Sequence, residues 1–270
     1  MVINPSYEQR KRLLLVGILL TVIALVLVDA ARGGSAEWSR VIARLPLLLT
    51  GSAQGWPITG GFLLNVVMGI ASMAIATAVG TLLGLSLLAR RRLVRQPAFV
   101  VMNFLRNAPW LVVLFAMLYL LPYRLTLLGV TFEFSPLAKA IIGLSLPTAA
   151  NFAEVIRGAV QSVHAGQWES ARSLGYSTAQ IYRRVILPQA FRRMIPGWMN
   201  LYALLMIATS LATVTGVQEV VTLLRTTLSM ESETTLVYFY LAVLAMFFAY
   251  CYPIALLARR LENKTKGDSL

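Results

Sequence analysis

Apolar residues occur along this chain in long continuous runs rather than in short alternating ones. The uncharged runs cover approximately residues 13–28, 61–89, 107–121, 140–153, 194–217 and 234–258. A helix needs about 20 residues to cross a hydrocarbon core of ~30 Å, whereas membrane-spanning strands alternate apolar and polar positions. The pattern therefore predicts an all-α fold, a polytopic transmembrane helical bundle of about six spans. The run at 140–153 is short, so its helix must extend through Glu154 to span.

The composition excludes several classes of protein. Of 270 residues, 58% are hydrophobic and only 13% are charged, which is far from the composition of a water-soluble domain. One cysteine, Cys251, and one histidine, His164, cannot supply a disulfide framework or a typical zinc site, so we expect no metal centre. No Gly-Lys pair occurs, which excludes a P-loop ATPase, and the scattered carboxylates form no catalytic cluster.

The positive charge lies mainly on one side of the predicted bilayer. The formal net charge is +13, an excess that could suggest nucleic acid, but its placement matters more than its size. The basic residues cluster at 10–12, 90–95, 157–193 and 259–266, all on the same side of the predicted spans. By the positive-inside rule, both termini are expected to face the cytoplasm, and no nucleic-acid partner is expected.

The chain divides into three predicted regions. Residues 1–60 comprise an N-terminal transmembrane helix and an outer segment, 29–60, that we expect on the bilayer surface. A signal peptide is the alternative for the first run, but the residues that follow it form a poor cleavage site, so a retained helix is predicted. Residues 61–262 form the main transmembrane domain, and 263–270 form a cytoplasmic tail.

The inner loop at 161–193 predicts two short helices outside the membrane. Trp168, Ala171 and Leu174 recur at helical spacing as an apolar stripe, while Glu169 and Arg172 can pair on the other face. Such a stripe in the cytosol needs a cover, either lipid head groups or a hydrophobic groove in another protein.

Two turn signals separate and bound these helices. Gly175 is expected to end the first helix, because glycine accepts the left-handed conformation that closes helix ends. Ser177 and Gln180 form a capping-box pattern for the second helix, which is predicted to end at Leu187 before Pro188.

The loop also carries a spaced signature. The run of Glu169, Ser170 and Ala171, then Gly175, then Val185 and Leu187-Pro188, resembles the cytoplasmic signature of permease subunits of ATP-binding-cassette importers. That signature is Glu-Ala-Ala, three residues, Gly, nine residues, Ile, one residue, Leu-Pro; here Ser and Val replace one Ala and the Ile. The flanking residues are similar to the polar amino-acid branch, and the resemblance covers roughly residues 60–262.

The resemblance implies how the loop is used and which partners it meets. In such permeases the short helix docks in a groove of a separate ATPase, which binds ATP and Mg²⁺, while the permease itself needs no cofactor. Two cytosolic ATPase subunits, a second permease subunit (the same or a similar chain), an extracytoplasmic amino-acid-binding protein and lipid are the implied partners, in the bacterial inner membrane. The implied coupling residues are Trp168, Glu169, Ala171, Leu174, Gly175, Leu187 and Pro188.

Polar groups inside the spans indicate where solute could pass, because such groups are costly when they face lipid. Glu154 and Arg157 are one turn apart, and an internal ion pair is favoured over a substrate contact. The candidate pathway residues are Asn65, Asn151, Glu154, Thr209, Ser210 and Thr213. Relatives often have Lys-Asp where this chain has Ile207-Ala208, which fits a less charged amino acid or specificity set by the binding protein.

Other hypotheses remain open at this stage. A stand-alone secondary transporter would need protonatable or sodium-binding groups that the spans scarcely offer, and an ATP-binding-cassette permease for a different small polar solute is also compatible. Gly80 and Gly84 share one face with Ala76 and allow a close helix contact, within this chain or with a partner, although ordinary glycine use in membrane helices explains them equally well.

Overall fold

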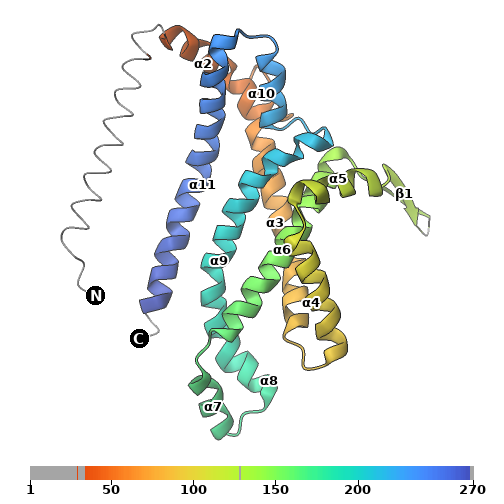
Figure 1. Cartoon of the computed structure of the whole chain (residues 1–270), viewed down its shortest axis with the longest axis vertical. Helices are drawn as coiled ribbons and strands as arrows, with labels where there is room; N and C mark the ends of the chain where they lie inside the picture. The colour runs from red at the N-terminus through yellow and green to blue at the C-terminus, as the bar shows by residue number, and fades with distance from the viewer. Residues whose placement is uncertain (1–28, 30–33, 128, 268–270) are drawn as a thin grey trace, which may run out of the picture.

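The structure is a computed structural model that describes residue 29, residues 34–127 and residues 129–267. The predicted first helix at 13–28, and with it the choice between a retained helix and a signal peptide, lies outside these residues. The described helices form an elongated bundle in which α7 and α8 lie at the same end as the C-terminal end of α11 (Figure 1). Helices α2 and α10 lie at the opposite end.

The elements follow one another along the chain with short connections. They are α2 (Gly34–Thr50), α3 (Gly61–Leu87), α4 (Arg92–Asn107), α5 (Trp110–Leu120), β1 (Arg124–Leu127), β2 (Val130–Glu133), α6 (Pro136–Gln161), α7 (Ala165–Ser173), α8 (Thr178–Gln180), the π-helix η1 (Ile181–Ile186), α9 (Leu187–Ala208), the 3-10 helix η2 (Thr209–Thr215), α10 (Val220–Leu228), the 3-10 helix η3 (Glu233–Thr235) and α11 (Leu236–Gly267). Within the part of the chain that the structure describes, the regular elements are helices apart from one antiparallel hairpin, β1–β2.

Membrane-spanning helices are present, as the apolar runs predict. Within the described residues, three helical segments are long and apolar enough to cross a membrane, namely Gly61–Leu87, Thr178–Thr215 and Glu233–Asn263. A fourth is possible if the bent pair α4 and α5 forms one span. Helix α6 contains the predicted run 140–153 and extends through Glu154, but it is not among these segments.

The predicted single span at 107–121 is wrong. Helix α4 ends at Asn107 and α5 begins at Trp110, and the two helices are bent by 105° relative to each other. Proline disfavours the helical conformation in the residue before it, and Ala108, which precedes Pro109, is extended with φ −70° and ψ 133°. The apolar pattern also did not reveal α4. Its first turn is basic and its sequence mixes polar and apolar residues, so it looks like a surface loop when only uncharged runs are sought.

Helices α3 and α6 pack closely through the glycines that the sequence singled out. A Cβ atom on Gly80 would lie 2.7 Å from the carbonyl oxygen of Ala149, and one on Gly84 would lie 3.0 Å from Cβ of Ile156. The close neighbour of this glycine face is therefore a helix of the same chain. The packing supports a core that includes Met68, Leu144 and Leu205, all fully buried.

Substitution of Gly80 by valine is expected to lower the stability of the bundle, because the new side chain meets backbone rather than a flexible side chain. Overpacking of this kind costs about 1–3 kcal/mol. The measurement is the thermal unfolding midpoint of the purified chain in detergent. Gly158→Ala on α6 is the matched control, since a Cβ at Gly158 meets nothing within 4 Å. An unchanged midpoint for Gly80→Val would contradict the close α3–α6 contact.

The predicted helix end at Leu187 is also wrong, because the helix continues through Pro188. The π-helical turn η1 precedes α9, and the amide of Leu187 donates to the carbonyl of Tyr182, five residues back. Pro188 has no N–H to donate to the preceding turn, and it follows the π-helical turn without ending the helix. The helical segment consequently runs without interruption from Thr178 to Thr215.

Candidate functional site

The cytosolic loop is built on α7, which has a defined start. His164 is its N-cap, and the Nδ1 atom of the exposed imidazole accepts a hydrogen bond of 3.1 Å from the amide of Gly166. A side chain that satisfies a free amide of the first turn stabilises a helix by about 0.5–2 kcal/mol. His164 therefore has a local structural role.

The end of α7 is closed by the glycine that the sequence indicated. Gly175 has φ +75°, its amide donates to the carbonyl of Arg172 at 2.9 Å, and the amide of Tyr176 donates to the carbonyl of Ala171 at 3.1 Å. These two bonds make the Schellman arrangement, in which the left-handed position favours glycine. The predicted role of Gly175 as the end of the helix is confirmed.

The apolar stripe of α7 is covered mainly by the chain itself, contrary to the expectation of an open stripe. Ala171 is only 3% exposed and Trp168 is half-buried, in a cluster with residues of α6, η1 and α9. The rings of Trp168 and Tyr182 meet edge to face with centroids 5.2 Å apart. Leu174, by contrast, is 73% exposed. Two of the three predicted anchors thus fix α7 to its own subunit, and one remains on the surface.

The polar side of α7 is exposed. Glu169 and Arg172 both face solvent, and among the described residues they form no ion pair with each other, so the predicted pairing is wrong. An exposed pair at this spacing stabilises a helix by only about 0.2–0.5 kcal/mol, which solvation of the two charges easily offsets. Glu169 and Arg172 on α7 and Leu174 at its end are therefore each exposed.

The second short helix starts as predicted. Ser177 and Gln180 form a complete capping box, in which Gln180 Oε1 accepts from the amide of Ser177 at 2.8 Å. Of the two other predicted coupling residues, Leu187 packs half-buried in the cluster beneath α7, and Pro188 is exposed in the first turn of α9.

Side-chain bonds tie this loop to the long helices. Gln189 of α9 donates to Gln167 of α7 at 3.2 Å, and Arg90, just after α3, donates to Thr178 of α8 at 2.7 Å. Arg193 of α9 donates to the backbone carbonyl of Ser162 at the end of α6. These bonds join α7 to α9, α8 to the segment that follows α3, and the end of α6 to α9.

The predicted ion pair in α6 is confirmed and has a third member. Arg157 Nη2 and Glu154 Oε1 are 2.6 Å apart, and Arg157 Nε donates to Glu154 Oε2 at 2.8 Å. Arg106, at the end of α4, adds a longer contact of 3.5 Å to the same carboxylate. Glu154 therefore holds α4 and α6 together near the α4–α5 bend.

Two predicted pathway residues meet in a buried cluster around a carboxylate that sequence reasoning missed. Asn65 Nδ2 donates to Thr209 Oγ1 at 3.1 Å and to Glu219 Oε2 at 3.2 Å, and Asn65 Oδ1 accepts from the amide of Val220 at 3.1 Å. Asn65, Thr209 and Glu219 are fully buried. The available signal was an acidic residue three positions after Gly216 and just before an apolar run, which is typical of a helix N-cap.

The other pathway candidates lie elsewhere. Thr213 Oγ1 accepts from Thr222 Oγ1 at 3.0 Å, close to the buried cluster in sequence. Asn151 donates to the carbonyl of Pro147 one turn back in α6, and Ser210 donates to the carbonyl of Ile207 in the same way. The six candidates therefore do not converge on one point within a single chain.

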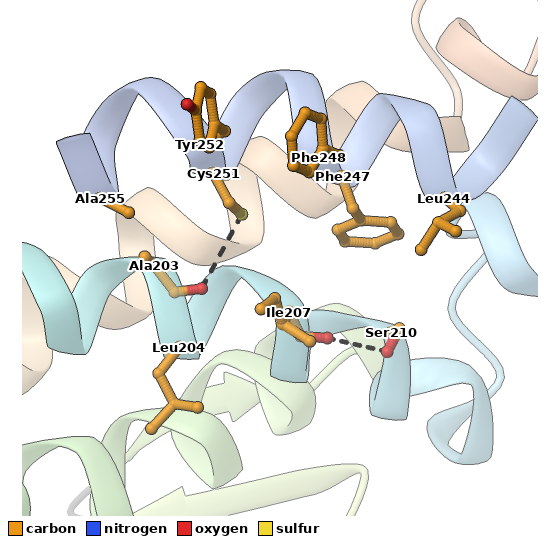
Figure 2. A pocket seen from close by; sticks show the side chains of 10 residues that line it. All are labelled: Ala203, Leu204, Ile207, Ser210, Leu244, Phe247, Phe248, Cys251, Tyr252 and Ala255. Atoms are coloured by element: carbon orange, nitrogen blue, oxygen red, sulfur yellow. Dashed lines mark hydrogen bonds between the residues drawn. The ribbon is translucent and has the colours of Figure 1, made fainter. Parts of the chain in front are cut away.

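A groove lies between α9 and α11 (Figure 2). It has a volume of about 520 Å³ and is almost entirely apolar, with Ser210 at one end. Its lining consists of Ala203, Leu204, Ile207, Ser210, Leu244, Phe247, Phe248, Cys251, Tyr252 and Ala255. Cys251 is buried there as a packing residue, with its thiol 3.8 Å from the carbonyl of Ala203. An apolar groove of this kind does not suit a polar solute.

Similarity to known proteins identifies the family to which the chain belongs. Residues 76–267 match the family described as "Binding-protein-dependent transport system inner membrane component". The probable amino-acid ABC transporter permease protein YckA of Bacillus subtilis (strain 168) is 34% identical over 200 residues, which are 74% of this chain and 85% of that protein. The probable glutamine ABC transporter permease protein GlnP of the same organism is 31% identical over 204 residues, covering 75% of this chain and 90% of that protein.

Solved structures share the fold. A chain from the crystal structure of an amino acid ABC transporter with histidines aligns with a TM-score of 0.65 and 21% identity over 75% of this chain and 91% of that one. A chain of the MetNI methionine ABC transporter in an inward-facing conformation aligns with a TM-score of 0.55 and 20% identity over 76% of this chain and 92% of that one. The match over most of the chain confirms the predicted resemblance: the protein belongs to the family of binding-protein-dependent transport system inner membrane components, the permease subunits of ATP-binding-cassette importers.

Proposed function

We propose that this chain forms part of the translocation pathway of an amino-acid importer and that a separate ATPase docks on the exposed side of α7. The docking proposal rests on one observation. Helix α7 is firmly attached to its own subunit and also has side chains exposed to solvent. Trp168 and Ala171 fix the helix to its own subunit, while Glu169 and Leu174 remain exposed. A lever that transmits force needs both properties.

The substrate class rests on the named relatives. The curated relatives YckA and GlnP are described as amino-acid and glutamine permeases, and both align over most of their length. The six candidate pathway residues are mainly uncharged, and Glu154 is neutralised by arginines. This supports a neutral or weakly charged amino acid, with the binding protein contributing to specificity.

The proposed complex contains two permease subunits, two ATPases and an extracytoplasmic binding protein. ATP and Mg²⁺ bind to the ATPases, and their closure pulls the α7 helices together. The bonds from Gln189, Arg90 and Arg193 then carry this displacement to the long helices, so that the pathway opens to the outside. The proposal places both termini in the cytoplasm, so that the end of the bundle with α7 and the C-terminal end of α11 (Figure 1) faces the ATPases.

The test is uptake into proteoliposomes that contain the chain with its candidate ATPase, supplied with a binding protein and labelled amino acids. We expect uptake only with hydrolysable ATP, and none with a non-hydrolysable analogue or with the chain alone. Uptake driven by an ion gradient without ATP would identify a secondary carrier instead. ATP-dependent uptake of another small solute, with no amino acid transported, would refute the substrate class alone.

A further inference from the structure

The β1–β2 hairpin projects from the helices just after α5 (Figure 1). Its strands pair antiparallel, with Leu125 opposite Phe132, and Gly129 in the turn has φ +82°. Every residue of β2 is exposed. Because an isolated two-stranded hairpin is only marginally stable in water, a further surface is needed to hold it.

One face of the hairpin is polar and satisfies itself. Arg124 lies opposite Glu133, with Nη2 and Oε1 2.9 Å apart, and Thr126 lies opposite Thr131, with their hydroxyl oxygens 3.1 Å apart. The two charges neutralise each other. This face can therefore remain in water and does not require a charged partner.

The other face is apolar and uncovered; we name it the hairpin apolar face. Because side chains alternate along a strand, Val130 and Phe132 share this face with Leu125. Val130 is 55% exposed and Phe132 is 49% exposed. The amide of Phe134 donates to the carbonyl of Tyr123 at 2.8 Å, which extends the pairing by one step and adds the exposed Tyr123 ring to the same face.

The course of α4 indicates the side of the bilayer on which the hairpin lies. Helix α4 begins at Arg92 within the basic cluster that marks the cytoplasmic side, and its 16 residues rise by about 24 Å. With the basic cluster on the cytoplasmic side, as proposed above, α4 leads the chain through most of a hydrocarbon core of ~30 Å, so the segment that follows α5 lies toward the outer side. The chain then turns by 105° from α4 into α5, which leads to the hairpin.

A buried lysine holds α5 and the start of α6 together at this level. Lys139, in the first turn of α6, donates from Nζ to the carbonyl of Leu118 at 2.9 Å, in the last turn of α5. A cation at the C-terminal end of a helix is favoured by the helix dipole. The hairpin connects these two helix ends, so it lies at the same depth as they do.

We propose that the β1–β2 hairpin is an interfacial membrane anchor, with its apolar face in the head-group region of the outer leaflet and its polar face in water. Aromatic side chains are favoured at this depth. Tyr123 and Phe132 are exposed on the hairpin, and Tyr119 is exposed near the end of α5, where it stacks with the exposed Phe115. The apolar surface is therefore continuous from α5 to the hairpin, and lipid is its partner.

The test compares adjacent residues on opposite faces of β2. In a Cys251→Ala background, Val130→Cys and Thr131→Cys are each spin-labelled in the full-length chain, in vesicles of phosphatidylethanolamine and phosphatidylglycerol. Collision with oxygen and with a water-soluble nickel chelate gives a depth parameter for each label. We expect oxygen to be favoured at position 130 and nickel at position 131, so that the depth parameter changes sign between them.

Two outcomes would overturn the anchor. Equal access of nickel to both labels would place the hairpin in water. Shielding of position 130 from both reagents would show that protein, such as a second copy of the chain, covers the apolar face. The pair Leu125→Cys and Thr126→Cys repeats the comparison on the other strand, and an unchanged thermal midpoint verifies that each labelled chain is folded.

Discussion

Glu169→Lys is expected to abolish ATP-driven uptake while the chain still inserts and folds. Glu169 is exposed on α7 and has no ion pair among the described residues, so its reversal leaves the subunit intact. Against a docking surface that accepts a carboxylate, the lysine introduces repulsion. A weakening of about 1.4 kcal/mol already lowers docking tenfold, and a reversed charge in a contact exceeds that amount.

The measurement has two parts, namely uptake and co-purification of the ATPase with the permease. Glu169→Gln is the matched control, because it removes the charge without reversing it and should give an intermediate loss. Leu174→Lys should also reduce co-purification, since Leu174 is the exposed apolar residue at the end of the same helix. Wild-type uptake in Glu169→Lys would mean that the ATPase does not dock on this side of α7.

Local signals in the sequence predicted much of the cytosolic loop. The Ser177–Gln180 capping box and the left-handed Gly175 depend on residues within a few positions of one another, and both are present as predicted. Pro188 misled the same reasoning, because a π-helical turn upstream shifts the hydrogen bonds and lets the helix continue. Such a shift leaves no simple trace in the order of residues.

The residues that pack against the apolar stripe of α7 could not be predicted from the stripe itself. Helical spacing shows that Trp168 and Ala171 share a face, but not that this face meets Tyr182 of the same chain. The α4–α5 bend was hidden for a related reason. Pro109 lies near one end of an apolar run. Hydropathy alone detects the run but does not show that the chain changes direction there.

The buried cluster shows a third limit. Asn65 and Thr209 stand out in the sequence as polar residues in spans, and polar residues in spans suggest solute contacts. Their partner Glu219 lies outside the apolar runs that drew attention to them. Glu219 directly precedes α10 in the sequence and caps it, but only the fold brings its carboxylate to Asn65.

Glu219→Ala is expected to have the largest effect on stability of any single substitution in this chain. The carboxylate is fully buried and accepts from the amides of Val221 at 2.9 Å and Thr222 at 2.7 Å, from the Thr222 hydroxyl at 3.0 Å and from Asn65 at 3.2 Å. Removing it leaves the amides of Val221 and Thr222 without this acceptor, at about 1–3 kcal/mol for each group that stays buried, while the Thr222 hydroxyl and Asn65 keep Thr213 and Thr209 as partners. The measurement is the thermal unfolding midpoint of the purified chain.

The matched variants separate a structural role of the cluster from a role in transport. Glu219→Gln keeps the size and one acceptor oxygen, so its midpoint should lie between those of wild type and Glu219→Ala. Because the two residues share one bond, Asn65→Ala combined with Glu219→Ala should destabilise less than the sum of the single changes. A wild-type midpoint for Glu219→Ala would show that water replaces the carboxylate. If Asn65→Ala retains the midpoint but loses uptake, Asn65 contacts the solute, since a residue that acts only through Glu219 would change both together.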